Sequence, residues 1–257
     1  MRLLVTRPQP QADDWAARLM ALGVDAAALP LLGIEGARDV QAVRRAWSGL
    51  GAQRLVMFVS PTAVLQFFAL RTGDDPWPAG VIAAGTGPGT AAALQRSGVP
   101  LQCVVCPAAD SPSFDSEALW RLLRERLDWR DASALIVRGE GGRDWLAQAL
   151  SAHGATVSFV DAYRRSAPAL DALARQLLAQ AQAQPLRHAW LFSSSEAARQ
   201  LPRLAPGGHW RESLALATHA RIETSVRSLG FGRVVQVLAT PAAVAEQMTR
   251  SIQSARS

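Results

Sequence analysis

The sequence contains no lysine, so all 27 basic residues among its 257 are arginine. A Walker A nucleotide loop requires a lysine and is therefore absent. The nearest match to a dinucleotide fingerprint, Gly85–Thr90, contains Pro88 and lacks the third glycine. No Gly-x-Ser-x-Gly nucleophile elbow occurs, and none of the histidines stands at metal-ligand spacing from another: His153, His188, His209 and His219. These absences favour chemistry without a metal or a cofactor, or a protein without catalytic chemistry.

Cysteine is also scarce, with only Cys103 and Cys106 in the segment LQCVVCP. Their spacing fits a redox pair or half of a zinc site. A redox pair sits at a helix N-terminus, whereas these two residues flank an apolar run typical of a strand, where positions three apart point to opposite faces. No second pair is available for zinc. We therefore expect two buried structural thiols.

Long apolar runs are missing. None reaches the ~18 residues needed to span a membrane, and the first apolar stretch is too short for a signal peptide because Arg7 and Pro8 interrupt it. We expect a cytoplasmic protein without membrane contact. Hydrophobic residues make up 49% and charged residues 19% of the chain, which is typical of a globular protein with one large domain or two ordinary ones.

The formal net charge is +6. Arginine pairs bidentately with carboxylates and phosphates, so the charge reflects either a solvated surface or a polyanionic partner. Nucleic acid and a polycarboxylate are the two candidates for that partner. Nucleic-acid binding usually needs a concentrated basic stripe, but no arginine run is longer than Arg44-Arg45 or Arg164-Arg165. The even spread disfavours nucleic acid.

Short apolar runs alternate with longer amphipathic stretches, the pattern of α/β folds with parallel sheets. We predict strands at Arg2–Thr6, Val24–Leu29, Arg54–Val59, Val81–Ala84, Leu101–Cys106, Ala134–Val137, Thr156–Val160, His188–Phe192, Ala215–Thr218 and Arg233–Leu238. We predict helices at Gln9–Leu22, Val40–Gly49, Pro61–Arg71, Pro88–Ser97, Ser116–Leu127, Gly142–Ala152, Ala169–Gln182, Ser195–Leu204, Ala220–Leu229 and Pro241–Ile252. Several helices precede a glycine suited to a left-handed C-cap: Gly23, Gly98, Gly154 and Gly230.

A weak internal repeat relates 58–64 (FVSPTAV) to 192–198 (FSSSEAA). In both, a strand runs into a hydroxyl-rich turn that opens a helix. The repeat indicates two doubly wound parallel-sheet domains, Rossmann-like or flavodoxin-like, although a chance match between two α/β segments would look similar.

Two Pro-bounded stretches, 30–37 and 161–168, resemble linkers between domains. They predict a discontinuous first domain, 1–35 plus 164–257, and a second domain, 36–163, joined by a two-stranded linker. Double linkers leave domains hinged around a cleft.

Polar residues follow several predicted strands. Helix N-termini offer free N–H groups and a positive dipole end, so they bind anions, and in doubly wound sheets such turns gather at the carboxyl ends of the strands. Plain helix capping is the alternative for any single turn. The predicted substrate contacts are Thr6, Arg7, Ser60, Pro61, Thr62, Thr86, Thr90, Arg138, Ser194, Ser195, His219 and Arg221.

Six segments carry a resemblance that covers nearly all of the chain. TRPxxxA near the start, FVSPTAVLQFF, AAGTGPGTAAALQRSG, VRGEGGRDWLAQAL, VDAYRRSAP and LFSSSEAARQL are similar, in order and spacing, to the blocks of the uroporphyrinogen-III synthase family. The resemblance implies two α/β domains on a two-stranded linker and a lyase without a cofactor. It also implies a linear hydroxymethyl tetrapyrrole substrate that is closed into a macrocycle with inversion of its last ring.

Carried over residue by residue, the family's linker tyrosine falls on Tyr163 and its threonine of the GxxTA block on Thr90. The hydroxyl turns fall on Ser60 and Ser194. One position departs from the family, because Ile222 stands where a late threonine is common, and His219 or Arg221 would have to replace that hydroxyl contact.

Tyr163, the only tyrosine, is the expected general acid for departure of the substrate hydroxyl; the alternative is a linker residue that only packs. Positioning of the substrate carries the rest of the reaction. We expect a monomer with no nucleic-acid partner and a transient contact with the preceding enzyme of the pathway. The rival functions are a non-enzymatic two-domain module that closes on a small polyanion and, from the basic charge alone, a nucleic-acid-associated protein.

Overall fold

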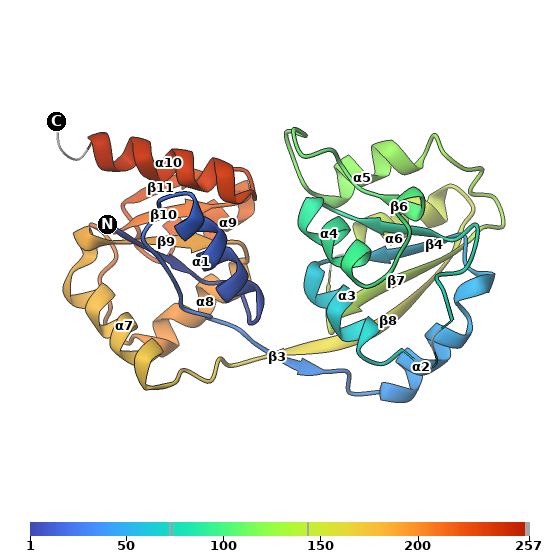
Figure 1. Cartoon of the computed structure of the whole chain (residues 1–257), viewed down its shortest axis with the longest axis horizontal. Coiled ribbons are helices and arrows are strands. Elements are labelled where there is room, and N and C mark those ends of the chain that lie inside the picture. Colours follow the sequence, from blue (N-terminus) through green and yellow to red (C-terminus); the bar gives the residue numbers. More distant parts are fainter. Residues whose placement is uncertain (72, 74, 143, 255–257) are drawn as a thin grey trace. The chain divides into compact units, whose positions relative to one another are not determined.

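The computed structural model describes residues 1–71, 73, 75–142 and 144–254, and it divides into two compact units. Unit 1 comprises Met1–Ile34 and Ser166–Ser257, and unit 2 comprises Glu35–Arg165. The chain therefore leaves unit 1 once and returns once, along strands β3 (Gly33–Gly36) and β8 (Thr156–Ser166), which are neighbours in one sheet (Figure 1). Within the described residues, no helix is long and apolar enough to cross a bilayer.

Unit 1 contains a five-stranded sheet in the order β11-β10-β9-β1-β2, with every neighbouring pair parallel. Numbered in chain order within the unit, this is the flavodoxin-like order 2-1-3-4-5. Its strands are β1 (Arg2–Val5), β2 (Ala26–Ala28), β9 (His188–Phe192), β10 (Leu214–Ala217) and β11 (Arg233–Gln236).

Helices cover both faces of this sheet, which is why β9 and β10 are buried along their whole length. Side chains of α1 (Gln11–Ala21) and α10 (Pro241–Ser254) form the core on one face. Those of α7 (Ala172–Ala183), α8 (Ser195–Leu204) and α9 (Ala220–Arg227) form the core on the other. The 3-10 turn η3 (Pro185–Arg187) leads into β9.

Unit 2 contains a six-stranded sheet in the order β3-β8-β7-β4-β5-β6. The five strands from β8 to β6 pair in parallel and, in chain order, read 5-4-1-2-3, the Rossmann-type arrangement. Besides β3 and β8 they are β4 (Leu55–Phe58), β5 (Ile82–Gly85), β6 (Val104–Val105) and β7 (Ser133–Gly139).

Two helix layers also cover this sheet. Helices α5 (Ser116–Leu123) and α6 (Trp145–Ala152) pack on one face. On α2 (Val40–Ser48) and α3 (Pro61–Phe68), Trp47 and Phe67 stack at 4.6 Å, and Phe67 meets Phe58 of β4 edge-on. Helix α4 (Pro88–Arg96) packs beside α3. The short 3-10 turns are η1 (Leu50–Ala52) and η2 (Leu101–Cys103).

The predicted fold class, two doubly wound α/β parallel sheets, is confirmed. The four glycines predicted as helix C-caps all have positive φ, between 81° and 94°. Arg143, inside the predicted helix Gly142–Ala152, lies outside the described residues.

Two local predictions were wrong. The predicted strand Leu101–Cys106 shrinks to Val104–Val105, because Leu101–Cys103 forms a 3-10 turn. Cys103 and Cys106 are accordingly only half-buried and are not core thiols. The predicted strand Thr156–Val160 is longer than expected, because β8 continues through the return segment as far as Ser166 and pairs with β3 in the two-stranded linker.

Candidate active site

Each sheet has one point where strand order reverses, and ligands of doubly wound proteins bind there, at the carboxyl ends of the strands. In unit 1 this point lies between β1 and β9, and in unit 2 between β4 and β7. The connections on the two sides of such a point run in opposite directions, which opens a crevice above the strand ends. The predicted site residues fall into two groups, one in each unit.

At the reversal in unit 2, Ser60, Gly139 and Tyr163 come together. Ser60 follows β4, Gly139 ends β7, and Tyr163 lies on β8. The Ser60 Oγ and the Tyr163 hydroxyl are 3.4 Å apart, although 103 residues separate them in the chain. Tyr163 is 3% exposed. The second domain's hydroxyl turn and the linker tyrosine thus form one cluster.

A β-bulge sets the direction of Tyr163. Arg138 pairs with Asp161, but the next residue of β7, Gly139, pairs with Tyr163, so that Ala162 is the extra residue. A bulge re-aims the side chains that follow it. The Tyr163 ring consequently lies against Gly139, where there is no side chain.

The other predicted contacts of unit 2 flank this cluster. Pro61 is the first residue of α3, and Thr62 is 7% exposed. Thr86 follows β5, and Thr90 lies in the first turn of α4. The Thr90 side chain packs directly on Gly85, since a Cβ added to Gly85 would lie 2.6 Å from the Thr90 methyl. Packing on Gly85 therefore holds the Thr90 side chain in place without a ligand.

The positive charge of Arg138 is already balanced by carboxylates within unit 2. Its guanidinium donates to Asp144 at 2.6 Å and to Asp161 at 3.1 Å, and it lies 4.1 Å from the centroid of the Phe159 ring. Two carboxylates balance its single positive charge, and these ion pairs argue against a role for Arg138 in substrate binding. That role stays a prediction.

At the reversal in unit 1, the β1 turn supplies Thr6 and Arg7. The Thr6 hydroxyl is buried and donates to the Leu191 carbonyl at 2.7 Å, so in this structure it joins β1 to β9. Arg7 lies over the Trp15 ring, 4.1 Å from its centroid, and its Nη1 donates to the Gln11 Oε1 at 3.4 Å.

Arg7 has no ion pair within the described part of the chain, and its Nε is buried without a hydrogen-bond partner. Burial, helped by the nearby charge of Arg18, lowers the pKa of Arg7 to about 10, against an opposing effect of Asp14. A half-buried cation without a matching carboxylate is suited to an anionic ligand.

The remaining turns of unit 1 act as helix caps. Ser194 accepts hydrogen bonds from the N–H groups of Glu196 and Ala197, as Ser60 does from Ala63 in unit 2. His219 caps α9 by accepting from the Arg221 N–H at 3.1 Å. The Ser195 hydroxyl donates to the Arg221 carbonyl at 3.4 Å, so the N-termini of α8 and α9 are adjacent.

Ile222, where the family often has threonine, is 8% exposed and belongs to the core of unit 1. Hydrophobic packing thus replaces a hydroxyl at this position. Arg221 is exposed beside it.

Sequence reasoning missed two residues at these edges. Thr240 follows β11, and its Oγ1 accepts from the Ala243 N–H at 3.3 Å. The signal was a threonine directly before a proline that opens a helix. Arg165 contacts the Tyr163 hydroxyl at 3.5 Å, a pairing that no sequence pattern indicates.

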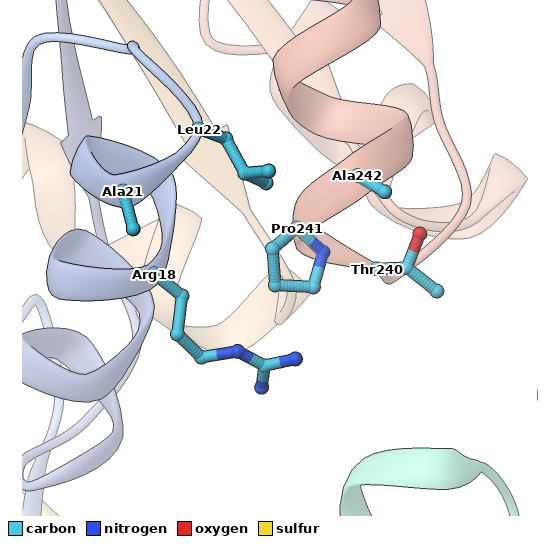
Figure 2. Close-up of a pocket in the computed structure, with 6 residues that line it drawn as sticks. All are labelled: Arg18, Ala21, Leu22, Thr240, Pro241 and Ala242. Carbon is cyan, nitrogen blue, oxygen red and sulfur yellow. The ribbon is translucent and has the colours of Figure 1, made fainter.

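Thr240 also borders a groove of about 370 Å³ in unit 1. In Figure 2, Arg18 of α1 and Leu22, the residue that follows α1, face Pro241 at the start of α10. The other lining residues are Ala21 and Ala242, so among the described residues that line it Arg18 supplies the only charge. Its apolar walls do not match a ligand with many carboxylates. Across the described residues, no three His, Cys, Asp or Glu side chains gather as a metal cluster.

Two doubly wound sheets, each with polar turns at its strand-order reversal, define a doubly wound α/β protein of two units. Residues 13–245 match the sequence profile of the family described as uroporphyrinogen-III synthase HemD. The chain belongs to the uroporphyrinogen-III synthase family.

Individual relatives agree with this assignment. The uroporphyrinogen-III synthase of Escherichia coli K12 is 30% identical over 238 residues, 90% of this chain and 92% of that protein. That of Salmonella typhimurium is 34% identical over 173 residues, 66% of this chain and 68% of that protein.

Two solved structures share the fold. A mutant uroporphyrinogen III synthase from the extremely thermophilic bacterium Thermus thermophilus superimposes with a TM-score of 0.58 at 17% identity, covering 99% of both chains. The Helicobacter pylori enzyme also gives 0.58, at 14% identity, covering 98% of this chain and 100% of that one. At these identities the likeness concerns the fold alone.

Proposed function

We propose that this protein is a cyclising hydro-lyase that converts hydroxymethylbilane into uroporphyrinogen III with loss of water and inversion of ring D. Family membership supports the proposal, and one structural observation carries it. Both sheets place helix N-termini and hydroxyl groups at the carboxyl edge, and Arg7 adds a cation without an ion pair there, within the described residues. A substrate with acetate and propionate groups on every ring needs such a set of anion-binding positions.

The chemical step requires one proton from the protein. In this proposal, Tyr163 donates its hydroxyl proton to the departing hydroxyl group, the C–O bond breaks, and water leaves behind an azafulvene cation. The electron pair of the substituted carbon of ring D then attacks that cation and forms a spiro intermediate. The bond from that substituted carbon to the methylene bridge of the neighbouring ring then breaks, and the bridge bonds instead to the unsubstituted α-carbon of ring D, which inverts the ring. Loss of the proton from that carbon restores aromaticity and returns a proton to the Tyr163 phenolate, so that water is the only group released.

Positioning of the substrate contributes more to the reaction than the proton transfer does. The substrate closes spontaneously to the uninverted isomer, so the protein must hold ring D with its substituted carbon nearest the reactive carbon. Contacts to the substrate carboxylates fix the substrate conformation in this scheme. The same scheme takes the protein to act in the cytoplasm as a monomer that receives its substrate from the preceding enzyme of the pathway.

The test is incubation with enzymatically generated hydroxymethylbilane, oxidation of the products to porphyrins, and separation of the type I and type III isomers. We expect type III to predominate at a rate that scales with protein concentration. If only type I forms, at the rate of the buffer control, the proposal fails. Binding of the substrate with that same outcome would favour a polyanion-binding module without chemistry.

A further inference from the structure

The Tyr163 hydroxyl has two polar neighbours in unit 2. Ser60 Oγ lies 3.4 Å from it, and Nη2 of Arg165 lies 3.5 Å from it. The Arg165 guanidinium also approaches the Tyr163 ring, 5.4 Å from its centroid. Both hydrogen bonds are long, as catalytic hydrogen bonds often are before a ligand binds.

Donor and acceptor counting fixes the direction of the Arg165 contact and allows Ser60 to be the donor in the other. A guanidinium can only donate, so the Tyr163 oxygen accepts from Arg165. Ser60 Oγ already accepts from the Ala63 N–H at 3.1 Å, as the N-cap of α3, and its one hydrogen is left to donate. If that hydrogen goes to Tyr163, the phenol oxygen accepts twice and its own proton is available to a third group.

Arg165 is itself held in place. Its Nη1 donates to the carbonyls of Glu140 and Gly141 at 3.2 and 3.4 Å, in the loop that follows β7. The loop after β7 thus fixes the guanidinium, and the start of α3 fixes Ser60. Contacts from two separate elements thus converge on one hydroxyl.

We propose that Ser60 and Arg165 are positioning residues that make the Tyr163 hydroxyl a directed proton donor. Neither residue gives a proton to the substrate. Ser60 and Arg165 occupy the acceptor sites of the phenol oxygen and leave its O–H aimed at the ligand. This inference rests on the proposed function only for the identity of the group that receives the proton.

The kinetic test uses Ser60→Gly, because glycine is tolerated as an N-cap almost as well as serine. We expect kcat for type III formation to fall about tenfold, a fraction of the ~10²–10⁴-fold value of general acid catalysis, with KM within about twofold of the parent. Ser60→Thr and Arg165→Lys keep the donor and should restore most of kcat, whereas Arg165→Met should not. Asp171→Ala removes the cap of α7 in unit 1 and is the matched control.

A double-mutant cycle separates positioning from capping. In a Tyr163→Phe background the phenol is gone, so Ser60→Gly and Arg165→Met should no longer reduce kcat. If each substitution costs the same factor in both backgrounds, Ser60 and Arg165 act independently of Tyr163 and the inference is overturned. A rise in KM at constant kcat would overturn it as well.

A spectroscopic readout makes the inference independent of turnover. The chain has a single tyrosine, so labelling tyrosine with ¹³C at Cζ gives one NMR signal that reports on the hydroxyl's hydrogen bonds. Ser60→Gly and Arg165→Met should each shift that signal, and Asp171→Ala should leave it unchanged. If the signal does not respond to Ser60→Gly and Arg165→Met, the positioning role is refuted even in an active enzyme. If it responds while no type III isomer forms, only the proposed function fails.

Discussion

The ring of Tyr163 rests on Gly139. A Cβ added to Gly139 would lie 2.6 Å from two ring carbons, Cε2 and Cζ, closer than real side chains approach. The backbone of β7 therefore forms the floor under the proposed catalytic ring, and glycine is needed there for space. The bulge at Ala162 and the absence of a side chain at Gly139 act together, since one aims the ring and the other makes room for it.

We expect Gly139→Ala to displace the ring and thereby to separate the Tyr163 hydroxyl from Ser60. Overpacking of this kind typically costs about 1–3 kcal/mol of unfolding free energy, and kcat should fall by at least as much as in Tyr163→Phe. Urea unfolding and initial rates measure both effects. Gly142→Ala is the control, because its Cβ would meet only Arg138 at an ordinary 3.6 Å. Equal behaviour of the two variants would mean that the ring adapts freely.

Tyr163→Phe removes the proposed proton donor and keeps the ring on Gly139. General acid assistance is worth ~10²–10⁴-fold in rate, and because the azafulvene forms readily we expect the low end of that range or less, with KM nearly unchanged. The measurement is the initial rate of type III formation against substrate concentration, corrected for spontaneous type I closure. Parent-like values of kcat and KM would show that Tyr163 only packs.

Arg7→Met should stabilise the free protein. Its folded pKa, about 10, lies well below the ordinary value for arginine, so the folded state disfavours the charged form. The free-energy cost is fully present below pH 10 and fades as the pH rises above the folded pKa towards the ordinary arginine value. One pKa unit corresponds to about 1.4 kcal/mol, and because the side chain is only half-buried we expect a gain of about 1 kcal/mol in urea unfolding at pH 7.

The same substitution should weaken substrate binding. A charge-assisted hydrogen bond contributes about 1.5–3 kcal/mol, so KM should rise about tenfold or more if Arg7 holds a carboxylate. Arg2→Met, at the opposite end of β1 and paired with Asp25 on the surface, should change neither quantity much. Lower stability with an unchanged KM would instead identify Arg7 as a residue that packs on Trp15.

Thr90 offers a test that divides packing from hydrogen bonding. Thr90→Val keeps the methyl group that lies on Gly85 and removes the hydroxyl, so KM should rise by the factor that about 0.5–1.5 kcal/mol represents, roughly two- to twelvefold. Thr90→Ala also removes the packing and should lower the melting temperature further than Thr90→Val. If valine leaves KM unchanged, the Thr90 hydroxyl does not touch the substrate.

Much of this protein could be predicted from local sequence. Buried parallel strands are continuous apolar runs, as at His188–Phe192, and a serine or threonine before a helix is a cap in any context. The repeat between 58–64 and 192–198 corresponds to real structural equivalence, since Ser60 and Ser194 both cap the helix after a central strand. The order of the motifs was enough to indicate the family.

Tertiary structure alone decided how the site residues meet. Strand alternation does not say whether Ala162 or Tyr163 faces Gly139; the bulge between β7 and β8 does, and it depends on backbone pairing between remote segments. The same holds for Ser60 and Tyr163, which become neighbours only through the order of strands in the sheet. Side-chain chemistry and turn signals are encoded locally, whereas register and strand order are settled by packing the whole sheet.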